Sequence, residues 1–194
     1  MSRSFKRKKR HVLAVITAAA VTAFFIAGIF AFSPPVQRLI YPTKYSDIVE
    51  KYASKNGLDK YFVYAVIKTE SNFDPKAESD VGARGLMQLM EVSYDWVKFR
   101  MNNDDMSVYG DLYDPEKNIK YGTYLLKLLY EEYGCKETAA AAYHTGRGNV
   151  NKWLADDRYS SDGKNLDDIP SKVTKHYVSK VMKAYDKYIS LYSK

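Results

Sequence analysis

The sequence predicts a mainly α-helical protein with one folded domain behind a single N-terminal membrane helix. Apolar residues recur at intervals of three and four in most segments after residue 43, as expected when one face of each helix is buried. Proline, glycine and acidic residues mark where these segments begin and end. No alternating apolar pattern predicts a pair of strands, and no repeat is apparent. The remaining chain of about 150 residues is a normal size for one domain with its own core.

The N-terminal residues predict a membrane anchor. Residues 1–11 form a basic arm, in which MSRSFKRKKR carries six basic side chains and no acid. Residues 12–32 are apolar except for two threonines and one glycine, and at about 1.5 Å per residue they can cross a hydrocarbon core of about 30 Å. Positive charge beside the span favours a cytoplasmic N-terminus and an extracytoplasmic domain. A cleaved signal peptide is the alternative, but the apolar run is long and AFSPP lacks a small-x-small cleavage site.

Charge and cysteine content exclude several classes of function. The chain has a formal net charge of +7, and nearly all of this excess lies in the basic arm, so no nucleic-acid-binding face is predicted. The single cysteine, Cys135, cannot form an internal disulfide and is expected to be a small buried residue. No Cys or His cluster has the spacing of metal ligands, so neither a metal nor another cofactor is predicted.

The elements follow from the local pattern. Residues 33–42 contain three prolines, which disfavour a continuous helix and predict a short stiff stalk, and the domain is expected to occupy residues 43–194. A first helix containing Tyr45 and Tyr52 should end at Gly57, and Asp59 should cap a second helix that ends at Glu70. Residues 73–84 are polar and predict a loop. The remaining helices are expected at 85–90, from Asp114 to Gly134, at 138–143 and from Pro170 to Tyr188.

Glu70 is the most informative residue of the chain. It continues an apolar helical stripe formed by Phe62, Val63, Val66 and Ile67, which precede it at helical spacing. Burial disfavours the charged form of a carboxyl group and raises its pKa toward the range of a general acid. The alternative is that this helix-terminal glutamate turns back to water or caps a neighbouring helix. Glu70 is therefore a candidate for protonating a leaving oxygen.

Glu70 lies in the first of four sequence segments that together form a recognisable pattern. They are TESNFDP at 69–75, VGARGLMQLM at 81–90, AAYHTGRGNVNKWL at 141–154 and IPSKVTKHYVSKV at 169–181. In this order and spacing the blocks resemble the soluble-lytic-transglycosylase (SLT) domain family, from about Tyr45 to Tyr188. The resemblance implies a lysozyme-like fold and cleavage of the glycan strands of bacterial peptidoglycan.

The resemblance also implies a reaction and a set of site residues. In the family one glutamate, here Glu70, acts first as acid and then as base on the MurNAc-GlcNAc β-1,4 bond. The C6 hydroxyl of MurNAc attacks its own anomeric carbon and forms a 1,6-anhydro end, without cofactor. The residues expected to line the cleft and bind the sugars are Ser79, Gln88, Met90, Tyr143, His144 and Tyr177. From the residues alone, Ser79 could equally cap a loop and Met90 could be ordinary core.

The chain departs from the family pattern at three positions. Glu91 stands where proline is usual, His144 where asparagine is usual, and Val173 where an acidic residue is usual. Glu91 is expected to affect only the start of a helix. His144 and Val173 border the expected cleft and could change substrate register or weaken activity, and His144 could add pH sensitivity because imidazole titrates near neutrality.

Two other functions stay open at this point. A goose-type-lysozyme-like muramidase would need a second carboxylate opposite Glu70, and the nearby candidates Asp74, Glu78 and Asp80 lie in a polar loop where solvation is expected. A catalytically weak glycan-binding module is the other alternative. The expected partners are peptidoglycan strands and the cytoplasmic membrane; the sequence identifies no partner in an envelope machinery.

Overall fold

The computed structural model describes residues 33–101 and 106–193, together with the isolated positions 16, 17, 20–22, 24 and 28. The predicted basic arm 1–11 and most of the predicted membrane segment 12–32 lie outside the described residues. Among the helices that are described, none combines the length and the apolar character needed to cross a membrane. The chain divides into two compact units, Met1–Pro42 and Thr43–Lys194, and each is considered by itself.

The first unit contains a short helix, α2 (Pro34–Ile40). The expectation that prolines disfavour a helix in residues 33–42 is wrong. Pro34 and Pro35 occupy the first two helical positions, where a missing N–H leaves no hydrogen bond unmade and the fixed φ suits the helix. Pro42 lies two residues beyond the last helical residue, Ile40, so none of the three prolines interrupts the helix.

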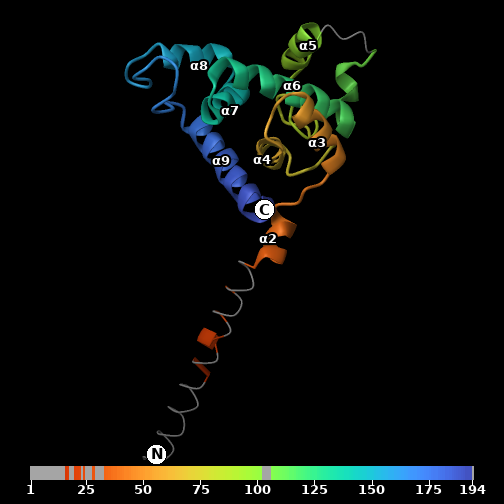
Figure 1. Ribbon diagram of the computed structural model, residues 1–194, viewed down its shortest axis with the longest axis vertical. Helices are drawn as coiled ribbons and strands as arrows, with labels where there is room; N and C mark the ends of the chain where they lie inside the picture. Colours follow the sequence, from red (N-terminus) through yellow and green to blue (C-terminus); the bar gives the residue numbers. More distant parts are fainter. Residues whose placement is uncertain are drawn as a thin grey trace, which may run out of the picture. The chain divides into compact units, whose positions relative to one another are not determined.

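The second unit is helical, in agreement with the predicted mainly α class (Figure 1). In its described residues, β structure is limited to isolated bridges that join Arg84 to Glu78 and to Leu89. Helix α4 packs against α9, while α6 packs against α3, α5 and α7. The helices are α3 (Ser46–Lys55), α4 (Lys60–Glu70), α5 (Glu91–Arg100), α6 (Pro115–Tyr133), α7 (Lys136–Thr145), α8 (Arg147–Leu154) and α9 (Lys172–Tyr192), with a 3₁₀ helix η1 (Tyr109–Tyr113) before α6.

Most helix ends follow the predicted signals. The Asp59 carboxylate accepts the Tyr61 N–H at 2.8 Å at the start of α4, and the Asp114 carboxylate accepts the Lys117 N–H at 2.9 Å at the start of α6. Gly134 ends α6 with a left-handed φ of +67°, a conformation that costs glycine little.

Three local expectations need correction. Helix α9 begins at Lys172 rather than at Pro170, because the Ser171 hydroxyl provides the N-cap. Cys135 is partly exposed at the N-cap position of α7 instead of buried. Helix α8 and η1 were not predicted: α8 carries few apolar residues, and η1 is a single short 3₁₀ segment.

Helix α4 lies at the centre of the core. Its residues Phe62, Val63, Val66 and Ile67 are at most 1 % exposed, as the apolar stripe predicted. The Tyr64 ring stacks on Tyr188 of α9, with centroids 5.4 Å apart. Glu70 is therefore the last residue of a helix whose central residues, 62–67, are all buried.

Residues 85–90 form a turn instead of the predicted helix. Gly85 has φ +74° and Gln88 has φ +46°, and neither value is compatible with a right-handed helix. The buried side chain of Asn118 on α6 stabilises this turn: its Nδ2 donates to the carbonyls of Arg84 and Leu112, both at 2.8 Å, and its Oδ1 accepts the Met87 N–H at 2.7 Å. The turn ends at Glu91, the first residue of α5.

Gly85→Ala should destabilise the fold more than Gly57→Ala. Both glycines have a left-handed φ, which costs an L-residue about 1–2 kcal/mol, but at Gly85 a Cβ would lie 2.2 Å from the Leu112 carbonyl oxygen and from Asn118 Nδ2. Nothing lies within 4 Å of a Cβ at Gly57. We expect the crowding to add about 1–3 kcal/mol, measured by denaturant unfolding followed by circular dichroism. Equal losses in the two variants would contradict this account of the turn.

Candidate active site

The candidate site is centred on the carboxyl group of Glu70. Its side chain is partly accessible, but most of the surroundings of the carboxyl group are protein, and this burial raises the pKa of Glu70 to about 7. The Tyr177 hydroxyl of α9 donates a hydrogen bond of 2.6 Å to Glu70 Oε1, which favours the ionised form and opposes part of that rise. Near neutral pH this carboxyl group can therefore both give and take a proton.

Two buried tyrosines stand beside Glu70. Burial and the Glu70 charge raise the pKa values of Tyr143 and Tyr177 well above the usual value, so both phenols stay protonated. Tyr177 uses its proton on Glu70, whereas Tyr143 donates to the Met87 carbonyl oxygen at 2.7 Å. Tyr143 thereby joins α7 to the turn that precedes α5.

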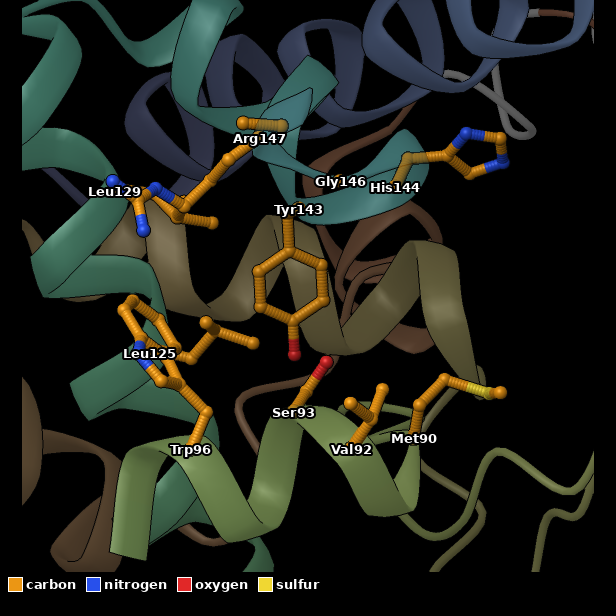
Figure 2. A pocket seen from close by; sticks show the side chains of 11 residues that line it. Met90, Val92, Ser93, Trp96, Leu125, Leu129, Tyr143, His144, Gly146 and Arg147 are labelled. Atoms are coloured by element: carbon orange, nitrogen blue, oxygen red, sulfur yellow. The ribbon is translucent and has the colours of Figure 1, made fainter. Parts of the chain in front are cut away.

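Tyr143 also lines a pocket of about 360 Å³ (Figure 2). The figure shows the Tyr143 ring projecting from α7 toward the start of α5. The lining is largely apolar and comes from α5, α6, α7 and the start of α8: Met90, Val92, Ser93, Trp96, Leu125, Leu129, Ala142, Tyr143, His144, Gly146 and Arg147. Glu70 does not line this pocket, but two of the lining residues are linked to it: Tyr143 interacts electrostatically with Glu70, and His144 packs on Tyr177.

His144 packs on the tyrosine that contacts the acid. Its ring lies against the Tyr177 ring with centroids 4.5 Å apart and an interplanar angle of 31°. Its Nδ1 is 3.2 Å from the Thr174 hydroxyl. Burial lowers the pKa of His144, so the neutral imidazole prevails at neutral pH.

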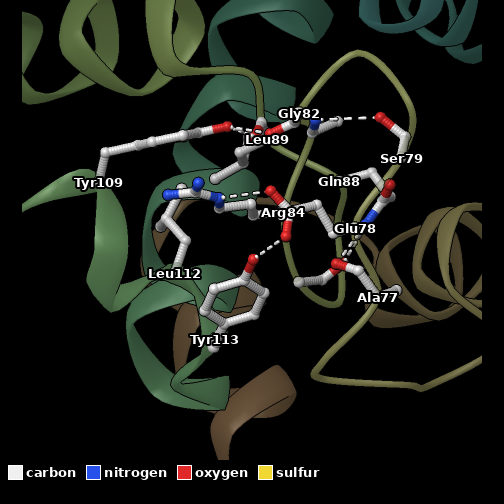
Figure 3. Close-up of polar contacts among 12 residues, drawn as sticks. Ala77, Glu78, Ser79, Gly82, Arg84, Gln88, Leu89, Tyr109, Leu112 and Tyr113 are labelled. Atoms are coloured by element: carbon white, nitrogen blue, oxygen red, sulfur yellow. Dashed lines mark hydrogen bonds and ion pairs between the residues drawn. The ribbon is translucent and has the colours of Figure 1, made fainter.

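The loop that contains Ser79 and Gln88 is stabilised by its own hydrogen bonds (Figure 3). The Ser79 hydroxyl accepts the Ala83 N–H at 3.0 Å, which is the loop-capping role that sequence alone left open. Gln88 Nε2 lies 3.0 Å from the carbonyl oxygens of both Ala77 and Gly85. The structure thus fixes where these two side chains lie, and their contact with sugar stays a prediction.

A cluster of polar and aromatic side chains fastens the same loop to η1 (Figure 3). The Glu78 carboxylate accepts Arg84 Nε at 3.2 Å and the Tyr113 hydroxyl at 2.5 Å. The Tyr109 hydroxyl lies 2.5 Å from the Gly82 carbonyl oxygen and 3.0 Å from that of Leu89. These hydrogen bonds therefore join both ends of the loop to η1.

Glu78 does not contribute to the pKa shift of Glu70. The hydrogen bond from Tyr113, followed by that from Arg84, lowers the pKa of Glu78, so this carboxylate is ionised and already engaged. Asp74 and Asp80 are exposed, as the polar loop predicted. Burial and Tyr177 account for the Glu70 pKa, with no contribution from another carboxylate in the described part of the chain.

Sequence reasoning did not identify Asn118 or Trp96. Asn118 supports the loop, and Trp96 lines the pocket. A signal existed for Asn118, because it lies on the apolar face of α6 with Gly122, Leu125 and Leu129, where an amide needs buried partners. The described residues contain no group of three or more His, Cys, Asp or Glu side chains that could hold a metal ion.

Comparison with known proteins identifies the family. The family model described as "Transglycosylase SLT domain" matches residues 47–166, which are more than half of the chain. The chain therefore belongs to the SLT domain family, as its sequence blocks predicted.

Individual relatives agree with this assignment. A soluble lytic murein transglycosylase of Escherichia coli K12 is 34 % identical over 150 residues, which are 76 % of this chain and 23 % of that protein. A membrane-bound lytic murein transglycosylase C of Haemophilus ducreyi is 30 % identical over 171 residues, covering 76 % of this chain and 46 % of the relative. The chain thus spans only about a quarter to a half of these relatives.

The fold has the same relatives. The crystal structure of the 70-kDa soluble lytic transglycosylase of Escherichia coli superposes with a TM-score of 0.73 and 28 % identity, over 82 % of this chain and 26 % of that one. The 70-kDa soluble lytic transglycosylase in complex with bulgecin A superposes equally well, with the same TM-score, identity and coverage. Both comparisons support the lysozyme-like class of fold that the resemblance implied.

Tyr177→Phe should raise the pKa of Glu70 above its value of about 7. The hydrogen bond from the Tyr177 hydroxyl stabilises the Glu70 carboxylate. Without it, the effect of burial on the pKa of Glu70 is less opposed. The titration can be followed by infrared difference spectroscopy of the carboxyl stretch, with Glu70→Gln used to assign the band. Tyr185→Phe is the matched control, because Tyr185 on the same helix donates to the Asp59 carboxylate at 2.7 Å. A Glu70 titration unmoved by Tyr177→Phe would contradict the role given to this hydrogen bond.

Proposed function

We propose that this chain is a peptidoglycan lytic transglycosylase that cleaves the MurNAc-GlcNAc β-1,4 bond and leaves 1,6-anhydroMurNAc ends. One observation carries the proposal: Glu70 is a buried carboxyl group with a pKa of about 7, hydrogen-bonded to Tyr177 and uninfluenced by a second described carboxylate. Glycosidases that use water or an enzyme nucleophile normally need two carboxylates. A single acid fits a reaction in which the substrate supplies its own nucleophile.

In the proposed reaction Glu70 serves twice. Protonated Glu70 donates its proton to the glycosidic oxygen while the bond from that oxygen to C1 of MurNAc breaks. The Glu70 carboxylate then accepts the proton of the C6 hydroxyl as that oxygen bonds to C1, so the acid is regenerated and no water is consumed. The Tyr177 O–H stabilises the carboxylate between these steps, and the tethered C6 hydroxyl has a high effective concentration.

The pocket beside Tyr143 would receive the sugar rings. Its apolar lining suits the flat faces of pyranose rings, and it includes Tyr143, Met90 and His144. We assign sugar binding also to Ser79 and Gln88, which lie on the stabilised loop that leads to Met90. The substrate strand would thus run from the pocket past Tyr143 to Glu70.

We further propose that residues 12–32 anchor the domain in the cytoplasmic membrane with the basic arm in the cytoplasm. The length of the apolar run and the adjacent positive charge support this orientation. Similarity to proteins described as membrane-bound lytic murein transglycosylase C is in keeping with a membrane location.

Glu70→Gln should abolish the formation of anhydro ends from purified peptidoglycan. General acid–base catalysis contributes about 10²–10⁴ in rate, and an amide can neither donate nor accept the required proton. Mass spectrometry of the soluble muropeptides measures the ends directly, and wild-type turnover should fall as pH rises through about 7, where Glu70 loses its proton. Glu116→Gln is the matched control, since Glu116 is an exposed carboxylate paired with Lys51.

The products also separate the competing functions. Hydrated reducing ends would make the protein a muramidase of the goose-type-lysozyme kind. Binding of glycan without new ends would make it a glycan-binding module. Near-normal turnover by Glu70→Gln would refute the assignment of the acid.

The membrane proposal predicts that Val21→Arg together with Phe24→Arg releases the full-length chain from alkaline-washed membranes. Arginine at the centre of a membrane helix costs about 2.5–3.5 kcal/mol on insertion scales. Replacing Lys8 and Lys9 by Gln should leave the chain in the membrane, because alkaline washing already removes proteins bound by charge alone. Release of the unaltered chain by the same wash would contradict the proposed membrane anchor.

A further inference from the structure

His144 covers part of the tyrosine that donates to Glu70. The His144 side chain is exposed, whereas Tyr177 is only 7 % exposed. The two rings pack with their centroids 4.5 Å apart and an interplanar angle of 31°. The imidazole therefore has one side against the phenol ring, and it shields that ring from water.

The imidazole is directed at α9. Figure 2 shows the His144 side chain pointing away from that of Tyr143, the preceding residue of α7. Its two contacts, with the Tyr177 ring and with the Thr174 hydroxyl, are both on α9. Tyr143 instead donates to the Met87 carbonyl oxygen. Consecutive residues of α7 thus contact different parts of the site.

The Thr174 hydroxyl holds the imidazole in place. Thr174 donates its hydroxyl proton to Ser171 Oγ at 3.1 Å, so its oxygen is left to accept from His144 Nδ1–H at 3.2 Å. Ser171 is itself fixed, because it is the N-cap of α9 and accepts the Thr174 N–H at 3.2 Å. Tyr177 lies three residues after Thr174 and so shares its helix face. His144 therefore spans the first turn of α9 and the tyrosine that follows it.

The Tyr177 hydroxyl depends on a fixed ring. It donates to Glu70 Oε1 at 2.6 Å, and a hydrogen bond weakens steeply when its donor turns out of line. The hydroxyl stands at the far end of the ring, so any turn of the ring displaces it. Among the described residues, His144 is the aromatic side chain that packs on this ring.

We propose that His144 is a positioning residue: its ring, held by Thr174, keeps the Tyr177 hydroxyl directed at Glu70. In the described part of the chain His144 makes no hydrogen bond to Glu70, so its effect passes through Tyr177. The inference deepens the proposed function, and its consequence for catalysis rests on that function. Its consequence for the titration of Glu70 does not.

The first test follows the Glu70 carboxyl stretch by infrared difference spectroscopy of the full-length chain. We expect His144→Ala to raise the pKa of Glu70 by about 0.4–1, the equivalent of one lost aromatic contact. In the Tyr177→Phe background the same change should leave the pKa where Tyr177→Phe alone puts it, or lower it by admitting water. An equal change in both backgrounds, or no change in the wild type, overturns the proposal.

Two further variants isolate the ring contact. His176→Ala is the matched control, since His176 is an exposed histidine directly before Tyr177 on α9, and it should leave the pKa of Glu70 unchanged. A rise as large as that in His144→Ala would contradict the proposal. His144→Phe keeps an aromatic ring at the position and should restore most of the wild-type pKa. A pKa equal to that of His144→Ala would overturn the role of the ring.

Turnover supplies a readout that depends on the proposed function. The fall of wild-type turnover near pH 7 should move to higher pH in His144→Ala, by the same amount as the pKa of Glu70. A higher KM for soluble glycan strands with an unmoved pH profile would assign His144 to sugar binding alone and overturn the proposal. A wild-type chain that forms no new ends would refute the proposed function, and the infrared titration would still decide whether His144 positions Tyr177.

Discussion

The hydrogen bond from Tyr177 to Glu70 is the interaction on which the rest of the site depends. It joins residues 107 positions apart, and it forms only when α9 lies in the correct register along α4. The stack of Tyr64 on Tyr188, six residues before Glu70 on α4 and eleven after Tyr177 on α9, fixes that register with apolar surface. Burial of α4 in turn raises the pKa of Glu70 to about 7. One helix pairing therefore sets both the position and the acidity of the catalytic candidate.

A second constraint links the loop to the pocket through α6. Asn118, near the start of α6, carries the three hydrogen bonds that shape the turn at Gly85, and Leu125 and Leu129 of the same helix line the pocket. Gly122 lets Met87 approach closely, since a Cβ there would lie 2.4 Å from its sulfur. Most residues predicted to contact sugar thus lie on a loop or a pocket wall that α6 supports, whereas Tyr177 lies on α9.

Sequence alone predicted the parts of the fold that local chemistry determines. Three helix ends were predicted correctly, from the capping residues Asp59 and Asp114 and from the terminal glycine of α6. The apolar stripe before Glu70 predicted the burial of its carboxyl group. The turn at Gly85 was missed because its positive φ values depend on Asn118, which is more than 30 residues away in sequence. For the same reason the stacking of His144 on Tyr177 could not be predicted: it depends on how α7 meets α9.

A single carboxyl group places particular demands on its surroundings. When two carboxylates lie close together, each shifts the pKa of the other, and the pair divides the roles of acid and base between them. Here the described chain offers Glu70 tyrosines instead, whose own pKa values burial holds far above neutrality. A tyrosine in that state supplies a hydrogen bond without exchanging its proton, so Tyr177 stabilises the Glu70 carboxylate, and neither tyrosine competes for the Glu70 proton. A group that must first donate and then recover one proton works best with a pKa near the ambient pH, and burial opposed by one phenol is sufficient to set it there.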